Sequence, residues 1–115
     1  MLEVDKTISI ADLKAMAARK FGNLVKAVID IRLQRIVVDA ELHSDEEAYL
    51  LENGSKQEDL WGINLYPELD PLDEEFIEFD SMINLRPSQG NISRGVENVD
   101  IRRTITETIR KAVAR

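Results

Sequence analysis

The chain contains no cysteine, only three prolines and five glycines, and no apolar run approaches the roughly 20 residues that a membrane-spanning helix needs. The absence of thiols excludes disulfides, cysteine-based zinc or iron–sulfur centres and thiol catalysis. The first six residues, Met-Leu-Glu-Val-Asp-Lys, carry charges where a signal peptide has its apolar segment. A length of 115 residues suits one domain, 1–115, with a modest core. These features predict a single-domain, soluble, cytoplasmic protein with no membrane segment.

Acidic residues are concentrated in the middle of the chain. Residues 39–80 hold one basic and fifteen acidic residues, whereas 1–38 carry a net charge of +3 and 81–115 a net charge of +4, for a total of −7. Nucleic acid is an unfavourable partner for a strongly acidic protein, because phosphate contacts supply most of that affinity. The acidic block is expected to be a solubilising surface that pairs with the basic ends. The alternative is a surface for a basic protein partner.

Two segments have the apolar spacing and the capping residues of helices. The first is predicted over 10–21, with Ser9 as its N-cap and Gly22 as its C-terminal stop. The second is predicted over 100–113, where isoleucines recur every four residues and either Asn98 or Asp100 caps the start. We therefore expect one helix near each end of the chain.

The segment after the first helix has the period of two that is typical of strands. Apolar and polar side chains alternate over 25–33, and after Gln34-Arg35 the alternation continues on the other parity over 36–42. A change of parity of this kind predicts a hairpin with a tight connection at Gln34-Arg35.

Residues 45–53 fit two interpretations. Ser44 and Glu47 have the spacing of a capping box, which would begin a short helix that ends near Asn53-Gly54. The Asn-Gly pair is equally a favoured hairpin turn, which would make 48–52 a strand. We favour the strand, because the flanking segments already form a sheet and the apolar run is short.

Further strands are expected over 60–66, which Pro67 ends, and over 76–86. Together the elements predict an α+β domain with a largely antiparallel sheet of about five strands, flanked by an N-terminal and a C-terminal helix that cover one face.

The best candidate site is the stretch 79–94, in which a strand with one polar face runs into a polar loop. Guanidinium groups, side-chain donors and backbone amides near a glycine suit a carboxylate or phosphate. The candidate residues of this stretch are Asp80, Asn84, Arg86, Ser88, Gln89, Gly90, Asn91 and Arg94. In the alternative interpretation, Arg86 pairs with Asp80 or Glu78, and the loop amides cap the turn into the last helix. No G-x-x-x-x-G-K-[ST] phosphate loop or G-x-S-x-G nucleophile turn is present.

His43 is the only histidine of the chain. On a continuous strand, Glu41, His43 and Asp45 would share a face, which is a weak pattern for a divalent metal or a general base. A second histidine is absent, so we predict local hydrogen bonding for His43 and neither a metal nor a cofactor. His43, Asn64 and Trp61 are nevertheless included as candidate ligand-binding residues beside the polar strand face.

The segments ELHSDEEAYLLENGSKQEDLWGINLYP, 41–67, and EFDSMINLRPSQGNISR, 78–94, resemble a family of small, uncharacterised bacterial proteins, a domain of unknown function. This resemblance extends over most of the chain. It implies a bacterial origin and assigns no catalytic role to any residue.

Two classes of function remain compatible with the sequence. The first is a domain that binds a small anionic or polar ligand at the strand end and loop 84–94. The second is a protein–protein interaction or regulatory module, compatible with a homo-oligomer, that uses the acidic surface of 39–80. A pocket with convergent polar groups would favour the first class, and a reaction type is not predicted by any motif.

Overall fold

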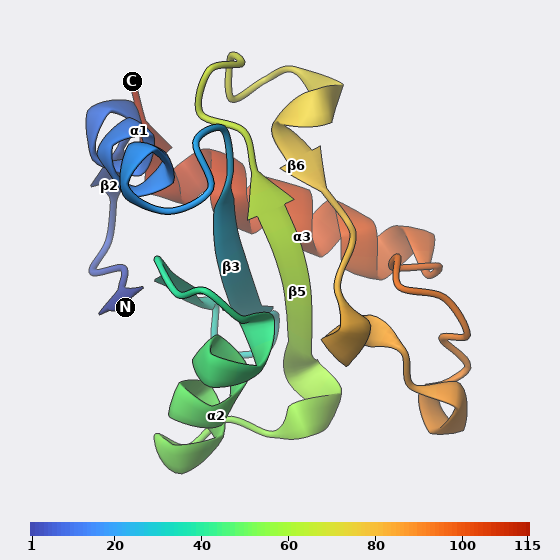
Figure 1. The fold of residues 1–115 in the computed structure, drawn as a ribbon. Helices are drawn as coiled ribbons and strands as arrows, with labels where there is room; N and C mark the ends of the chain where they lie inside the picture. The colour runs from blue at the N-terminus through green and yellow to red at the C-terminus, as the bar shows by residue number, and fades with distance from the viewer.

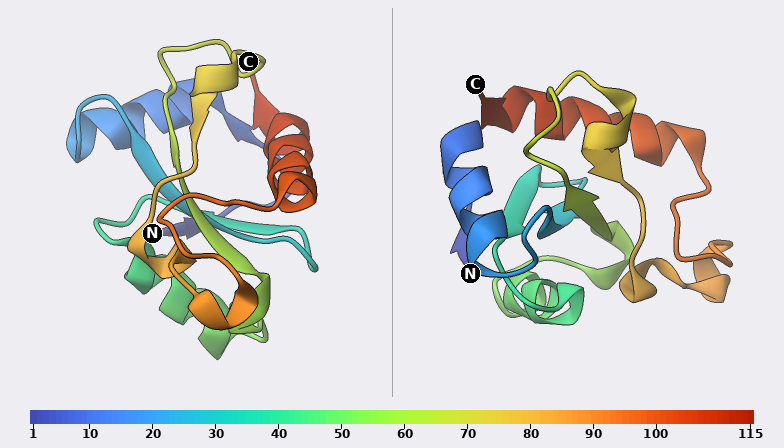
Figure 2. Two further views of the ribbon diagram at one scale, coloured as in Figure 1. Left: turned by 90° about the vertical axis from the view of Figure 1, so that its right-hand side faces the viewer. Right: turned by 45° about the horizontal axis from the view of Figure 1, so that its top comes forward.

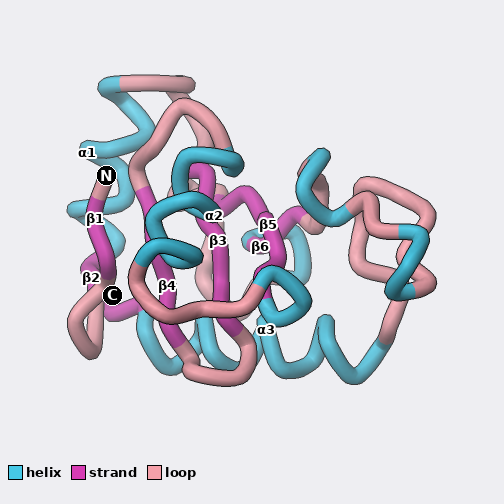
Figure 3. The backbone as a smooth tube through the Cα atoms, turned by 90° about the horizontal axis from the view of Figure 1, so that it is seen from below, coloured by secondary structure: helices cyan, strands magenta, loops and turns pink.

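The computed structural model describes all residues, 1–115, and has the predicted α+β architecture (Figure 1). Its main sheet has the strand order β1-β4-β3-β5-β6, with every pairing antiparallel (Figure 3). These strands are β1 (Leu2–Glu3), β3 (Val25–Asp30), β4 (Arg35–Val38), β5 (Leu60–Leu65) and β6 (Ile77–Glu78). A separate parallel pair joins β2 (Ile8–Ser9) to β7 (Val113–Ala114). The three α-helices are α1 (Ile10–Arg19), α2 (His43–Glu52) and α3 (Val99–Ala112).

The predicted terminal helices are confirmed, each with a local cap. In α1, the Ser9 hydroxyl accepts a hydrogen bond from the Asp12 amide at 3.0 Å, and Gly22, at a φ of +89°, donates its amide to Ala17 O. In α3, the Asn98 side chain accepts from the amides of two first-turn residues. This identifies Asn98 as the cap. None of the three helices combines the length and the apolar character that crossing a membrane requires.

The predicted hairpin is confirmed as β3–β4, but its connection is 31–34 rather than Gln34-Arg35, because Arg35 begins β4 and pairs with Asp30. The Asp30 carboxylate accepts from the amides of Arg32 and Leu33, and Gln34 closes the turn at a φ of +56°. Because Asp30 bonds to the turn in this way, β3 ends earlier than the alternation predicts.

The predicted strand over 48–52 is wrong, because this segment belongs to the helix α2. Helical spacing buries His43, Glu46 and Leu50 against the sheet, whereas a strand would divide them between two faces. Gly54, at a φ of +101°, ends the helix and lets the Ser55 amide bond to Leu50 O at 3.0 Å. The capping box of the helical interpretation does not form, because the N-cap residue is Leu42 and it makes no side-chain cap bond.

The predicted strand over 76–86 is also wrong for most of its length. Only Ile77 and Glu78 pair with β5, and the chain then forms two short 3₁₀ helices, η3 (Met82–Asn84) and η4 (Pro87–Gln89). Arg86 pairs with Asn91 in an isolated bridge that closes the loop between them.

Helices cover both faces of the sheet, which corrects the expectation of a single covered face. The main core lies between the sheet and the helices α1 and α3. A smaller core on the other face joins Leu50 of α2 to Val28, Val37 and Leu60. The left view of Figure 2 shows α2 and α3 on opposite sides of the strands.

Candidate functional site

A pocket lies where the N-terminal end of α2 meets the sheet. Three register partners form a row across this end of the sheet: Lys26 on β3, Asn64 on β5 and Glu78 on β6. The pocket has a volume of about 220 Å³. Its polar lining includes Lys26, His43, Asn64, Asp80 and Arg94, and we call it the His43–Asn64 pocket. Four of these five residues belong to the predicted site.

His43 is the first residue of α2 and is 7% exposed. Its Nε2 lies 2.7 Å from the carbonyl oxygen of Ile63. Because a carbonyl can only accept, Nε2 carries the proton and Nδ1 keeps its lone pair in the neutral ring. Burial lowers the pKa of His43, and the positive charge of Lys26 acts in the same direction. The neutral imidazole is therefore favoured, and its Nδ1 is available as an acceptor.

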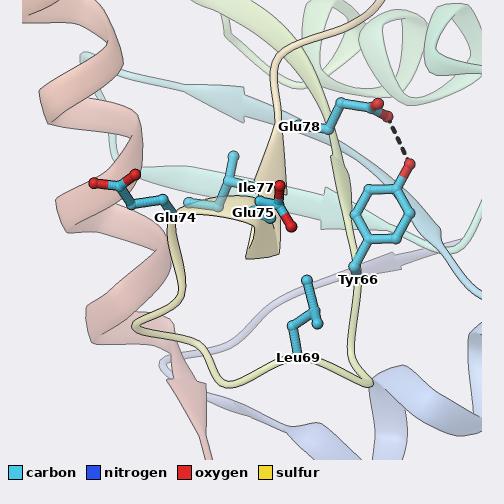
Figure 4. Close-up of a pocket in the computed structure, with 6 residues that line it drawn as sticks. All are labelled: Tyr66, Leu69, Glu74, Glu75, Ile77 and Glu78. Carbon is cyan, nitrogen blue, oxygen red and sulfur yellow. Dashed lines mark hydrogen bonds between the residues drawn. The ribbon is translucent and has the colours of Figure 1, made fainter.

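Asn64 lines the same pocket and has an unpartnered acceptor in its side chain. Its Nδ2 donates to Glu78 Oε1 at 2.8 Å, and the Tyr66 hydroxyl donates to the same oxygen at 2.8 Å (Figure 4). A carboxylate oxygen only accepts, so this contact sets the orientation of the Asn64 amide. Asn64 Oδ1 is left buried without a hydrogen-bond partner, a deficit that typically costs about 1–3 kcal/mol. A bound donor would remove this cost.

Charged groups surround these two acceptors. Arg94 Nε lies 2.8 Å from Asp80 Oδ1, an ion pair that is largely exposed. Lys26 makes no salt bridge, and its Nζ lies 5.2 Å from the centre of the Phe21 ring. The N-terminus of α2, with no side-chain cap, adds backbone N–H groups and the positive end of the helix dipole. The pocket thus combines one free cation with one ion pair.

Other predicted residues hold the loop 84–94 in place. The Arg86 guanidinium donates to the carbonyls of Gln57 and Leu60 and lies 4.2 Å from the centre of the Trp61 ring, so it does not pair with Asp80. Asn91 donates to the carbonyls of Asn84, Ser93 and Gly95. The residues of the predicted site that are buried in such contacts or in the core are Trp61, Asn84, Arg86 and Asn91.

Ser88, Gln89 and Gly90 form the exposed tip of this loop. The Gln89 side chain accepts from Arg86 Nη1 at 2.9 Å and donates to Glu58 O at 3.1 Å. None of the three residues lines the His43–Asn64 pocket. The structure therefore divides the predicted site residues into a pocket group, a buried group and an exposed tip.

A family model matches residues 2–112 of the chain, almost its whole length. The chain belongs to this family, which is described as Protein of unknown function (DUF5674). No curated protein and no solved structure matches the chain.

Lys26 is a pocket residue that was not among the predicted site residues. A usable signal was present, because Lys26 alternates with apolar residues and so lies on the polar parity of its strand. The alternation shows which face of the strand Lys26 lies on, but it does not show which strand is its neighbour. Only the strand pairing of the folded sheet places Lys26 beside Asn64. The metal hypothesis for Glu41, His43 and Asp45 required a continuous strand, whereas His43 and Asp45 lie in the first turn of α2.

A second depression, of about 370 Å³, lies beside Tyr66 and Glu78 (Figure 4). Tyr66, Leu69 and Ile77 form its apolar part, and Glu74, Glu75 and Glu78 its polar part. Burial, together with the hydrogen bond to Glu78, raises the pKa of Tyr66 to about 12. Three glutamates without a lysine or arginine would repel an anion, so the predicted type of ligand suits the His43–Asn64 pocket better.

Proposed function

We propose that this domain binds a small anionic or polar molecule in the His43–Asn64 pocket. The observation that carries the proposal is the buried Asn64 Oδ1, which has no partner and belongs to a residue that lines a cavity, together with the unpaired cation Lys26. Buried polar groups are normally hydrogen-bonded, so an unpartnered acceptor on a cavity-lining residue supports a ligand position.

The charge of the pocket supports an anionic group on the ligand. The charged residues that line the pocket are Lys26, Arg94 and Asp80, so the lining has a net charge of +1. The net charge of the whole chain is −7. The amides at the start of α2 are a further donor set for a carboxylate or phosphate. An anion would therefore be attracted to this pocket and repelled by most of the surrounding surface.

The predicted site residues then have two roles in this proposal. His43, Asn64, Asp80 and Arg94 contact the ligand together with Lys26. Two hydrogen bonds hold the backbone of Arg94 in place. The Asn84 side chain donates to Arg94 O at 3.0 Å, and the Ser81 amide donates to the same carbonyl at 2.9 Å. The loop bonds in this way keep Arg94 beside Asp80.

A titration with two simple anions tests the proposal. Inorganic phosphate and acetate, added to ¹⁵N-labelled protein, are expected to shift the amide signals of residues 42–44 and the side-chain amide of Asn64. Lys26→Met is expected to weaken the binding at least about tenfold, which corresponds to about 1.4 kcal/mol. Lys14→Met is the matched control, because Lys14 is an exposed lysine of α1. Equal binding by both variants, or no shift with either anion, would contradict the proposal.

The acidic surface supports a second candidate function, binding of a basic protein segment. The depression in Figure 4 has an apolar floor beside three glutamates, which suits the aliphatic stem and the charged end of a lysine or arginine. Binding of an oligolysine or oligoarginine peptide that shifts Glu74 and Glu75, and leaves His43 unchanged, would favour this candidate.

A further inference from the structure

We infer that the ligand of the His43–Asn64 pocket is an aliphatic α-amino acid bound as its zwitterion. This inference rests on the proposed function and narrows it to one class of ligand. It follows from the acceptors of the pocket, from the order of its charges and from the residues of its rim.

The pocket contains more acceptors than a simple anion can use. Asn64 Oδ1 is unpartnered, and Nδ1 of the neutral His43 ring has no hydrogen-bond partner in the protein. Asp80 uses Oδ1 for Arg94, which leaves Oδ2 without a partner. Acetate has no hydrogen to donate to these atoms, whereas an ammonium group has three N–H donors and the opposite charge to Asp80.

The charges also lie in the order that a zwitterion requires. Lys26 on β3 is the register partner of Asn64 on β5, and Asn64 is the partner of Glu78 on β6, two residues before Asp80. Adjacent antiparallel strands place partner Cα atoms about 5 Å apart, so Lys26, Asn64 and the segment that leads from Glu78 to Asp80 follow one another across the sheet. The carboxylate of an amino acid would meet Lys26 and the start of α2. Its ammonium group would meet Asn64 and Asp80.

The apolar rim of the pocket favours a ligand with an aliphatic side chain. Leu42, Met82 and Ile83 line the same cavity, and Leu42 and Met82 are 55% and 63% exposed. An aliphatic side chain would cover apolar surface that is otherwise in water. A small volume of about 220 Å³ suits an amino acid better than a nucleotide or a long peptide.

Calorimetric titration of the unmodified protein with three related compounds tests this inference. L-leucine carries both charged groups, 4-methylpentanoate lacks the ammonium group, and leucinamide lacks the carboxylate. We expect L-leucine to bind at least about tenfold more tightly than either analogue. Equal affinity for L-leucine and 4-methylpentanoate would overturn the zwitterion and leave the anion site of the proposed function standing. If none of the three binds while phosphate does, the inference fails alone, and if phosphate also fails, both proposals fail.

Two variants connect the binding to the pocket. Asn64→Ala removes the unpartnered acceptor and is expected to weaken L-leucine binding at least about tenfold. Asn23→Ala is the control, since Asn23 is exposed and makes no side-chain hydrogen bond. The comparison of ligands on the unmodified protein keeps the test valid if Asn64→Ala does not fold. Unchanged L-leucine affinity in a folded Asn64→Ala variant would overturn the inference.

Discussion

Arg86 illustrates how a single side chain stabilises the loop beyond β6. It is 9% exposed, and its guanidinium donates to two main-chain carbonyls while it stacks on Trp61. Its Nε is buried without a partner, and burial lowers the pKa of the group. Bonds from a charged donor to buried carbonyls are stronger than neutral ones, so this residue contributes mainly to stability.

We therefore expect Arg86→Ala to lower the free energy of unfolding by about 2–4 kcal/mol, because the carbonyls of Gln57 and Leu60 lose their donor. Urea denaturation, followed by circular dichroism, measures this change. Arg102→Ala is the control, as Arg102 is exposed on α3, and should change stability by less than about 0.5 kcal/mol. If Arg86→Ala were as stable as the control, the guanidinium would have no structural role.

Glu46 is a buried carboxyl group that should make stability depend on pH. It is 0% exposed, and its only bond is from the Ala40 amide to Oε2 at 3.3 Å. Burial raises its pKa from an ordinary 4.5 to about 10. The folded state therefore keeps this proton when the unfolded state loses it. The stabilising contribution is complete below pH 4.5 and is lost as the pH rises towards 10.

The isosteric variant Glu46→Gln should remove this dependence, because it cannot ionise. We expect it to raise the free energy of unfolding at pH 7 by about 3 kcal/mol and to leave it nearly unchanged at pH 4. Denaturation curves at several pH values measure the difference, with Glu52→Gln at the exposed end of α2 as the control. An equal effect at pH 4 and pH 7 would show that the pKa of Glu46 is not raised in the folded protein.

Among the elements, the end of β6 shows how a side chain can replace a strand. The Asn84 side chain accepts from the Gly62 amide at 2.8 Å and donates to the Gly62 carbonyl at 2.9 Å, as a paired residue would. Gly62 leaves room for this contact, since a Cβ there would lie 2.6 Å from Ser81 Cβ. The edge of β5 is thus completed by η3 after β6 has ended.

Both partners of this contact should be sensitive to substitution. Asn84→Ala leaves the buried N–H and C=O of Gly62 unpaired and should cost about 2–4 kcal/mol, and Gly62→Ala should be similarly destabilising because Ser81 has to move. Hydrogen exchange offers a second measurement, because the Gly62 amide should lose its protection in Asn84→Ala. Asn23→Ala again serves as the control. Retained protection at Gly62 would contradict the role given to Asn84.

These elements also show which parts of the structure the sequence could predict. Capping residues and helical apolar spacing predicted α1 and α3, and the alternation of apolar and polar residues predicted the β3–β4 hairpin. These signals lie close together in the sequence. Alternation over 76–86 was misleading, since the polar Asn84 points into the sheet rather than into solvent. Asn53-Gly54 fits a helix end and a hairpin equally well, and only the packing of Leu50 on Val28 and Val37 decides for the helix.

The candidate site depended even more on tertiary structure. His43 and Asn64 were predicted to lie beside the polar face of a strand 76–86 that does not form. They meet Asp80 and Arg94 because β5, α2 and the segment after β6 converge on one face of the sheet. The sequence emphasised Arg86 instead, because an arginine beside a polar loop resembles an anion site. Its buried hydrogen bonds to Gln57 and Leu60 connect segments almost 30 residues apart and have no local signal.

At the scale of the whole molecule, the two ends of the chain are fastened together. The parallel pair β2–β7 joins Ile8 to Val113, and both residues belong to the main core. Arg115 also reaches Asp70, at 2.6 Å, in the loop that precedes β6. The last three residues therefore connect α3, the N-terminal segment and the acidic loop.

Deletion of residues 113–115 should accordingly destabilise the whole domain. Loss of the β2–β7 pair and of the buried Val113 side chain is expected to cost about 2–3 kcal/mol, which lowers the melting temperature by about 8–20 °C for a domain of this size. Arg115→Ala alone should cost less than about 1 kcal/mol, because its ion pair is exposed. Scanning calorimetry compares the two. A deletion that melts like Arg115→Ala would mean that the β2–β7 pair contributes little, and that the core between α1 and α3 is sufficient to hold the ends of the chain together.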